Sequence, residues 1–145
     1  LKQHFAASLL AHHLRRSTQV REGKMPATFT PVTTTTEIDI LIKQSTEIPV
    51  ILFNHDPYCP ISRRAYHQME AVPHAITLID VSRYRTATRH ISASTHIRHE
   101  SPQVILLFQG RSVWSASHGA ITREAVEQAW QQTQEQVLLD NTVLD

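Results

Sequence analysis

The chain has 145 residues, 41% of them hydrophobic and 19% charged, and this length and composition fit one globular domain. Its net charge of +1 provides no strong electrostatic field to attract nucleic acid or an anionic membrane. Its three glycines lie too far apart for the clustered-glycine loops that bind nucleotides. The single cysteine, Cys59, excludes an internal disulfide, a CxxC redox pair and a multi-cysteine metal site within one chain, and this usage fits a reducing compartment, so we expect a cytoplasmic protein.

Residues Leu1–Lys24 differ from the rest of the chain. They carry five basic residues and one acidic residue beside a short apolar stretch, which is typical of an amphipathic basic helix, a transit peptide or a leader outside the domain. We expect the domain to begin at Met25 and assign the leader no part in the chemistry. No segment approaches the roughly 18 consecutive apolar residues of a membrane span, so no membrane partner is expected.

The predicted elements alternate helices with buried strands. Thr34 and Glu37 form an S/T-x-x-E capping box, which predicts a helix start. Short apolar runs predict strands buried on both faces, and Pro60 favours a helix that begins beside Cys59, because proline suits the first helical position. In chain order we expect a loop over 26–36, a helix to about 45, a strand over 50–53, a polar loop over 54–58, a helix over 61–72, a strand over 76–81, a helix over 84–96, a hairpin with strands over 104–108 and 113–116, and a helix over 123–137 capped by Thr122.

This alternation, with its short connections, predicts an α/β fold with a central mixed β-sheet flanked by helices on both faces. The order of elements is that of the thioredoxin-like fold. We place this domain at residues 25–137 and treat residues 138–145 as a C-terminal tail without a readable motif.

Cys59 follows the first predicted strand, at the amino end of the next helix. The free N–H groups and the positive end of the helix dipole favour a thiolate there, and Arg63 and Arg64 in the next turn could add to this field. A free cysteine is often a small core residue instead, but the polar, proline-flanked neighbours of Cys59 indicate a loop-to-helix junction. We therefore interpret Cys59 as a reactive, at least partly exposed thiol.

Ser62 occupies the position, three residues after Cys59, where a dithiol oxidoreductase has its second cysteine. In such enzymes that second thiol attacks the mixed disulfide formed by the first. The sequence Cys59-Pro60-Ile61-Ser62 therefore predicts a mixed disulfide that an external thiol must resolve. The Ser62 hydroxyl could donate a hydrogen bond to the thiolate, or Ser62 could be only a helix-start residue.

Ser101-Pro102 directly precedes the strand predicted over 104–108. Only about 5 to 6% of X-Pro bonds in folded proteins are cis, so the local sequence favours trans. In thioredoxin-type folds, however, a cis proline at this place faces the nucleophilic cysteine, and the backbone before it is free to pair with an extended substrate. From this position in the fold we expect Pro102 to be cis.

Four stretches of the chain together form a specific pattern. They are Phe53-Asn54-His55, Cys59-Pro60-Ile61-Ser62, His99-Glu100-Ser101-Pro102-Gln103 and Ala116-Ser117-His118. The pattern resembles the monothiol bacilliredoxins, small thioredoxin-fold proteins of the bacillithiol system, over roughly residues 29–130. This resemblance implies an oxidative-stress enzyme that removes bacillithiol from mixed disulfides on oxidised proteins, with the cysteine as nucleophile.

The expected site follows from this resemblance and from the C-x-x-S motif. Bacillithiol, or another low-molecular-weight thiol, is expected as a co-substrate, with no tightly bound cofactor and no metal. The expected partners are S-thiolated proteins, and a second thiol molecule or a partner reductase that restores the cysteine. His55, His99 and His118 match family positions, but the residues alone give no role for any of them. We assign catalysis to Cys59, Ser62 and Pro102, and substrate binding to Ser101, Tyr58, Pro60 and His118.

Two other functions remain open from the residues alone. The same fold could hold extended peptides at Pro102 without catalysis, in which case Cys59 is incidental. A dimer could instead share an iron-sulfur cluster, with one cysteine from each subunit and two small thiols, as C-x-x-S glutaredoxins do. The ten histidines show no spacing typical of a metal site.

Overall fold

The computed structural model describes residues 26–143. The leader predicted over 1–24 and the end of the predicted tail, 144–145, lie outside the described residues. The described chain forms β1 (Thr28–Pro31), α2 (Thr35–Gln44), β2 (Val50–His55), α3 (Pro60–Glu70), β3 (Ala75–Asp80), α4 (Arg85–Thr95), β4 (Gln103–Phe108), β5 (Arg111–Ser117), the short 3₁₀ helix η1 (His118–Ala120) and α5 (Arg123–Thr142), in that order.

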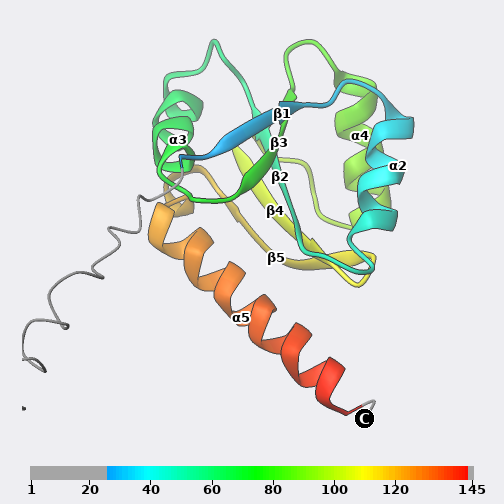
Figure 1. The fold of residues 1–145 in the computed structure, drawn as a ribbon. Coiled ribbons are helices and arrows are strands. Elements are labelled where there is room, and N and C mark those ends of the chain that lie inside the picture. Colours follow the sequence, from blue (N-terminus) through cyan, green and yellow to red (C-terminus); the bar gives the residue numbers. More distant parts are fainter. Residues whose placement is uncertain (1–25, 144–145) are drawn as a thin grey trace, which may run out of the picture.

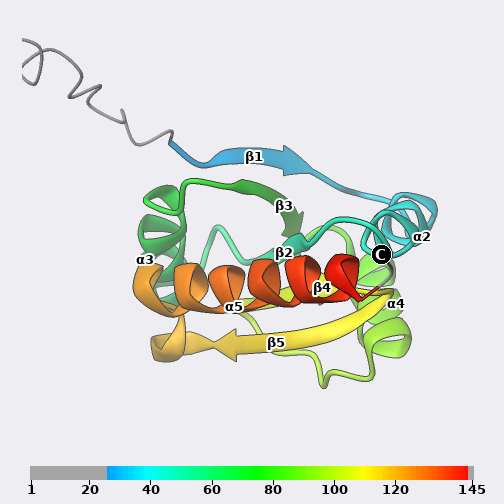
Figure 2. The same ribbon diagram turned by 60° about the horizontal axis from the view of Figure 1, so that its bottom comes forward.

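The strands form one mixed sheet in the order β1-β3-β2-β4-β5. β1 and β2 run parallel to β3, β4 runs antiparallel to β2, and β5 runs antiparallel to β4. Helices α2 and α4 lie on one side of the sheet and α3 and α5 on the other (Figure 1), and α5 runs across β4 (Figure 2). The predicted α/β architecture, a mixed sheet with helices on both faces, is confirmed.

Each face of the sheet buries its own apolar cluster, and β2 contributes to both. Ile51 and Phe53 pack with residues of α3 and α5, whereas Val50 and Leu52 pack with residues of α2 and α4. Successive side chains of a strand point to opposite faces, so one continuous apolar run supplies both clusters. The prediction of a strand buried on both faces is confirmed, since every residue of β2 is buried.

The observed helix starts agree closely with those predicted from the sequence. The Thr34 hydroxyl accepts the Glu37 N–H at 3.2 Å, and the Glu37 carboxylate accepts the Thr34 N–H at 3.0 Å, which completes the predicted capping box at α2. Pro60 is the first residue of α3, and the Thr122 hydroxyl caps α5 by accepting the Ala125 N–H at 3.1 Å. Local side-chain chemistry decides these positions, so they can be read from a few neighbouring residues.

The segment before the first helix is not the predicted loop, because Thr28–Pro31 form the edge strand β1. This strand pairs in parallel with Ala75–Leu78 of β3. The partner lies far along the chain, and a short segment that ends in proline carries little strand signal of its own. Long-range pairing therefore creates this strand, and a local reading misses it.

β2 also extends further than predicted. Asn54 and His55 belong to the strand, where the sequence predicts a polar loop. Asn54 pairs with Gln103 across the antiparallel ladder, and His55 pairs with Asp80 across the parallel one. These ladder partners hold two polar residues in a strand at the end that leads to Cys59.

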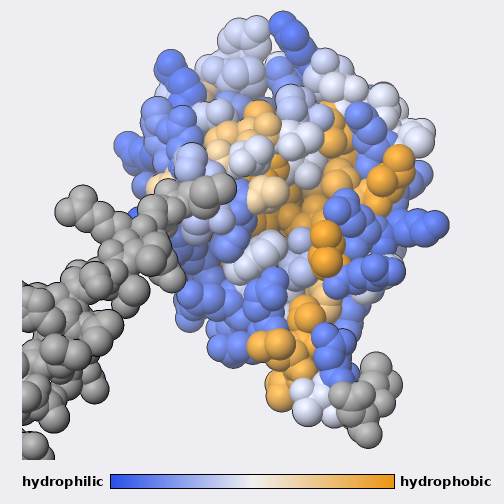
Figure 3. All heavy atoms as spheres, viewed as in Figure 1, coloured by the Kyte–Doolittle hydropathy of each residue, from blue (hydrophilic) through white to orange (hydrophobic). Residues whose placement is uncertain are grey.

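α5 runs to Thr142, past the predicted end at 137 and into the predicted tail. Asp140 ties this last part to the sheet, because its carboxylate accepts the Gln109 side-chain N–H at 2.8 Å from the turn between β4 and β5. Leu138 and Leu139 are exposed, and Figure 3 shows hydrophobic side chains gathered over this end of the helix. None of the helices within residues 26–143, α5 included, is long and apolar enough to cross a membrane.

Candidate thiol site

Cys59 is the N-cap residue of α3, immediately before Pro60. Its backbone oxygen accepts the Arg63 N–H at 3.0 Å, which closes the first helical turn. The side chain is half-buried, so Cys59 is not a core cysteine. The thiol thus lies where the free N–H groups and the dipole of an eleven-residue helix favour a negative charge, as predicted.

Ser62, one turn after Cys59, is fully buried and bonded to the preceding loop. Its hydroxyl oxygen accepts the Asp56 N–H at 2.9 Å and lies 2.7 Å from Nδ1 of His55. Ser62 is therefore more than a helix-start residue, because it joins α3 to the end of β2. If Nδ1 carries its hydrogen, the Ser62 hydroxyl hydrogen is free to point elsewhere; if Nδ1 is the acceptor, that hydrogen is used by His55. The predicted hydrogen bond from Ser62 to a Cys59 thiolate stays a prediction.

His55 is the residue of this site that the sequence analysis left without a role. His55 is only 8% exposed, and its ring packs against the rings of Phe53 and Tyr66, with centroids 5.4 Å and 5.0 Å away. Burial lowers the pKa of His55 below its ordinary value, while Asp80 and Asp56 act in the opposite direction. His55 is thus neutral near pH 7 and can both donate and accept. Its place two residues after Phe53 in one strand is the signal that could have found it.

The Ser101-Pro102 bond is cis, as expected from its place in the fold. Gln103 pairs with Asn54, so Pro102 lies at the end of the sheet where β2 leads to Cys59. Ser101 is half-buried, and its hydroxyl oxygen has no hydrogen-bond partner among the described residues. The structure therefore brings the two expected substrate-facing segments to one edge of the sheet.

His118 is hydrogen-bonded to the segment Ser101-Pro102, which we call the proline segment. Its N–H donates to the Pro102 carbonyl oxygen at 3.1 Å, and its backbone is left-handed with φ of 52°. His118 also lines a groove of about 470 Å³ together with Pro60, Ile61 and other residues of α3 and η1. Three predicted site residues, Pro60, Pro102 and His118, are thus brought together.

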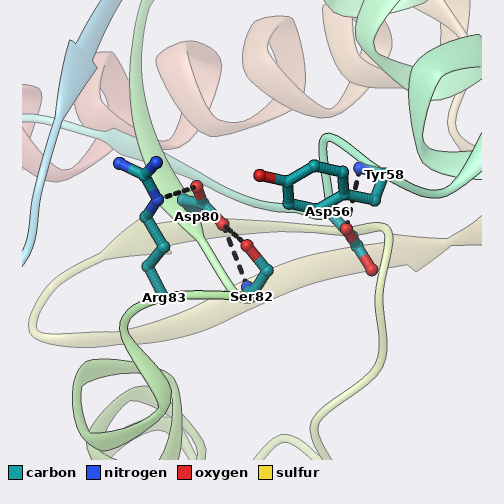
Figure 4. Close-up of polar contacts among 5 residues, drawn as sticks. All are labelled: Asp56, Tyr58, Asp80, Ser82 and Arg83. Atoms are coloured by element: carbon teal, nitrogen blue, oxygen red, sulfur yellow. Dashed lines mark hydrogen bonds and ion pairs between the residues drawn. The ribbon is translucent and has the colours of Figure 1, made fainter.

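Tyr58 stands apart from this groove, 75% exposed, in the loop before Cys59. Its N–H donates to the Asp56 carboxylate at 2.9 Å. In Figure 4 the Tyr58 ring extends from this loop toward Asp80, whose carboxylate accepts the Ser82 N–H at 3.0 Å and lies 3.8 Å from Nε of Arg83. The carboxylates of Asp56 and Asp80 are therefore each engaged within their own loop. Within the described part of the chain, no three His, Cys, Asp or Glu side chains are grouped as metal ligands.

Comparisons with solved structures agree with this fold. A protein described as having a thioredoxin fold is 26% identical, with a TM-score of 0.65 over 70% of this chain and 92% of its own. A thioredoxin from Fasciola hepatica is 14% identical, with a TM-score of 0.56 over 70% and 96% of the two chains. Thioredoxin NaTrxh from Nicotiana alata is 12% identical, with a TM-score of 0.58 over 74% and 93%. The thioredoxin-like fold is confirmed.

A separate comparison identifies the family to which the chain belongs. The family model described as monothiol bacilliredoxin BrxC matches residues 30–126. This range contains Cys59, Ser62, Pro102 and His118, and it covers most of the described domain. With its single cysteine at the start of α3, the chain belongs to the monothiol bacilliredoxin family.

Proposed function

We propose that this protein is a monothiol thiol-disulfide oxidoreductase that removes a low-molecular-weight thiol, bacillithiol by its family, from mixed disulfides on oxidised proteins. The observation that supports this most is the placement of Cys59, the only cysteine of the chain. It is half-buried and caps an eleven-residue helix, where the backbone N–H groups favour the thiolate that exchange requires.

In the proposed reaction, the Cys59 thiolate attacks the sulfur that the small thiol contributes to the mixed disulfide. A new S–S bond joins Cys59 to the small thiol, and the S–S bond to the target protein breaks. The target sulfur leaves with the bonding electrons and takes a proton from water. Cys59 is oxidised as the target cysteine is reduced, so no further oxidant is needed.

A second exchange restores the protein. Since Ser62 stands where a resolving thiol would be, an external thiolate must attack the adduct on Cys59. If that thiolate is a second small thiol, the products are a small-molecule disulfide and the Cys59 thiolate; a partner reductase is the other route. The small thiol is then a co-substrate rather than a bound cofactor, and a reducing compartment such as the cytoplasm suits this cycle.

The substrate would lie across the edge formed by α3, the proline segment and η1. An extended segment can pair with the backbone before Pro102, where Ser101 is half-buried. The groove lined by Pro60 and His118 has a mostly apolar surface. The exposed Tyr58 ring projects from the loop before Cys59 (Figure 4). These groups suit contacts with the target protein, where aromatic residues are common anchors.

The test is to incubate the protein with a glutathionylated protein and to record its intact mass. We expect one thiol adduct on Cys59 and release of the target thiol. The variant Cys59→Ser should form no adduct. A matched control, Cys59→Ser with Ser115→Cys, keeps one thiol but places it on the exposed face of β5; it should react no faster than an ordinary thiol.

Equal deglutathionylation by wild type and Cys59→Ser would overturn the proposal. An unreactive Cys59 in a protein that still binds extended peptides would instead indicate a binding module. A brown, dimeric protein would indicate an iron-sulfur cluster carrier.

A further inference from the structure

A second groove of about 590 Å³ lies along α4, the helix that packs on the face of the sheet opposite α3. Val81 lines it, and its N–H donates to the His55 carbonyl oxygen at 3.0 Å, at the end of the strand that leads to Cys59. His99 also lines it, three residues before Pro102. The groove therefore begins beside the last residue of β2, four residues before Cys59, and runs along α4. Its volume falls within the range of small-molecule sites.

The floor of this groove offers few free polar groups. The Thr88 hydroxyl donates to the Tyr84 carbonyl oxygen at 3.0 Å, and the Ser92 hydroxyl donates to the Ile97 carbonyl oxygen at 2.7 Å. Both hydroxyl hydrogens are thus used by the backbone. A ligand in this groove would be recognised mainly by the basic side chains on its rim.

Those rim residues are Arg85, Arg89 and His99. Both arginines are exposed, and none of the three side chains has an ion pair or hydrogen bond within residues 26–143. Partial burial lowers the pKa of His99, with Glu100 opposing it, so the arginines carry the positive charge near pH 7. By contrast, Arg83, just before α4, lies beside the Asp80 carboxylate (Figure 4).

The arginine pair does not serve the stability of α4. Arg85 is the first residue of the helix, where the dipole disfavours a cation, and Arg89 follows four residues later on the same face. The helix contains no acidic residue to offset them. Two unpaired guanidinium groups along a small-molecule-sized groove match the geometry of carboxylate recognition, which is often bidentate.

We propose that this basic groove binds the carboxylates of the low-molecular-weight thiol while Cys59 attacks its sulfur. The ligand class is a small thiol that bears one or more carboxylates, and Arg85 and Arg89 are its specificity residues. The inference rests on the proposed function, and it adds to that function a preference for an anionic thiol over a neutral one.

The test compares two small disulfides, glutathione disulfide, which bears carboxylates, and hydroxyethyl disulfide, which is uncharged. The quantity measured is the ratio of their rate constants with Cys59. In the double variant Arg85→Gln/Arg89→Gln we expect this ratio to fall about fivefold or more, because charge-assisted hydrogen bonds to the carboxylates are lost. The matched control Arg98→Gln/Arg111→Gln removes the same charge at exposed sites outside the groove and should change the ratio by less than about twofold, the size of a general field effect.

A binding measurement tests the groove without the reaction. Cys59→Ser should bind S-methylglutathione by calorimetry, and adding Arg85→Gln/Arg89→Gln should abolish that binding. If Cys59→Ser binds this probe through the arginines but wild type reacts with neither disulfide, the groove stands and the proposed function fails.

Three results would overturn the inference. The ratio could stay unchanged in Arg85→Gln/Arg89→Gln, or it could fall equally in the control variant. The arginine variant could also slow only the exchange with glutathionylated peptides rich in acidic residues, which would assign the groove to the protein substrate rather than to the small thiol.

Discussion

The two faces of the sheet differ most at the edge beside Cys59. His55 points to the α3 face and contacts Ser62, whereas Asn54 lies on the opposite face and its side-chain N–H donates to Gln103 at 3.3 Å. The Gln103 amide in turn donates to the Arg98 carbonyl oxygen at 2.9 Å. His55 therefore contacts α3, the helix that begins beside the nucleophile. Asn54, its neighbour in the strand, is connected through Gln103 to the loop before Pro102.

This difference shows how one strand can position both parts of the candidate site, the start of α3 beside Cys59 and the segment that contains Pro102. On the α3 face, the Ser62 hydroxyl and Nδ1 of His55 are bonded to each other, and the same hydroxyl accepts the Asp56 N–H. On the α4 face, the Asn54 side-chain oxygen has no partner among the described residues. We infer that the α3 face is the more rigid support, because a satisfied buried network resists rearrangement and an unsatisfied one does not.

The largest expected effect comes from Ser62→Cys, which would change the outcome of the reaction on the α3 face. Positions 59 and 62 lie on the same side of one helical turn, so the introduced thiol can attack the adduct on Cys59, form an internal disulfide and release the small thiol. After treatment with glutathione disulfide, intact mass should show the loss of two hydrogens and no lasting adduct. A persistent adduct on Cys59 would show that the two side chains cannot meet.

Ser62→Ala should reduce the free energy of unfolding by about 1 to 3 kcal/mol, because the Asp56 N–H and the His55 Nδ1 would lose their buried partner. The measurement is chemical denaturation at pH 7. A loss well below this range would mean that water replaces the hydroxyl, and the rigid support inferred for the α3 face would be wrong.

Ser101→Ala is the matched control, since it makes the same change beside the proline segment. The Ser101 hydroxyl has no hydrogen-bond partner in the described part of the chain, so no bond is lost. We expect a change of less than about 0.5 kcal/mol. Equal losses for the two alanine variants would contradict the contrast between bonded Ser62 and unbonded Ser101.

The smallest expected effect is a dependence of stability on pH through His55. Burial lowers the pKa of His55 in the folded protein, so the unfolded chain binds a proton more readily than the folded one below about pH 6.5, the ordinary histidine pKa. The free energy of unfolding should therefore fall as the pH drops from about 6.5 through the folded-state pKa of His55. Denaturation curves at several pH values between neutral and acidic conditions measure this slope.

His55→Phe keeps a ring beside Phe53 and Tyr66 and should flatten the slope. It should not abolish it, because burial also lowers the pKa of His74 and His99. An unaltered slope in His55→Phe would show that His55 does not resist protonation.

Much of the fold could be predicted from short-range signals. The capping box of Thr34 and Glu37 fixed the start of α2, and Pro60 fixed the start of α3 beside Cys59. The edge strand β1 could not be predicted, because its strand partner, β3, lies far along the chain. Tertiary pairing decides such a strand, and local composition does not.

The positions of the candidate site residues in the fold could be predicted, whereas their contacts could be predicted less well. Cys59, Ser62 and Pro102 are recognisable from motif and position, and the structure places all three at one end of the sheet. The bond between His55 and Ser62 was missed because the sequence predicts a loop over 54–58. Once His55 is known to continue the strand, its direction follows from that of Phe53.

The alternation along β2 also constrains how this family can change in length. Inserting or deleting one residue within the strand would reverse the direction of every side chain after it. Asn54 would then point toward α3 and His55 toward α4, even though no residue near Cys59 had been replaced. Among homologues, the number of residues between Val50 and the nucleophile should therefore vary less than the identities of those residues.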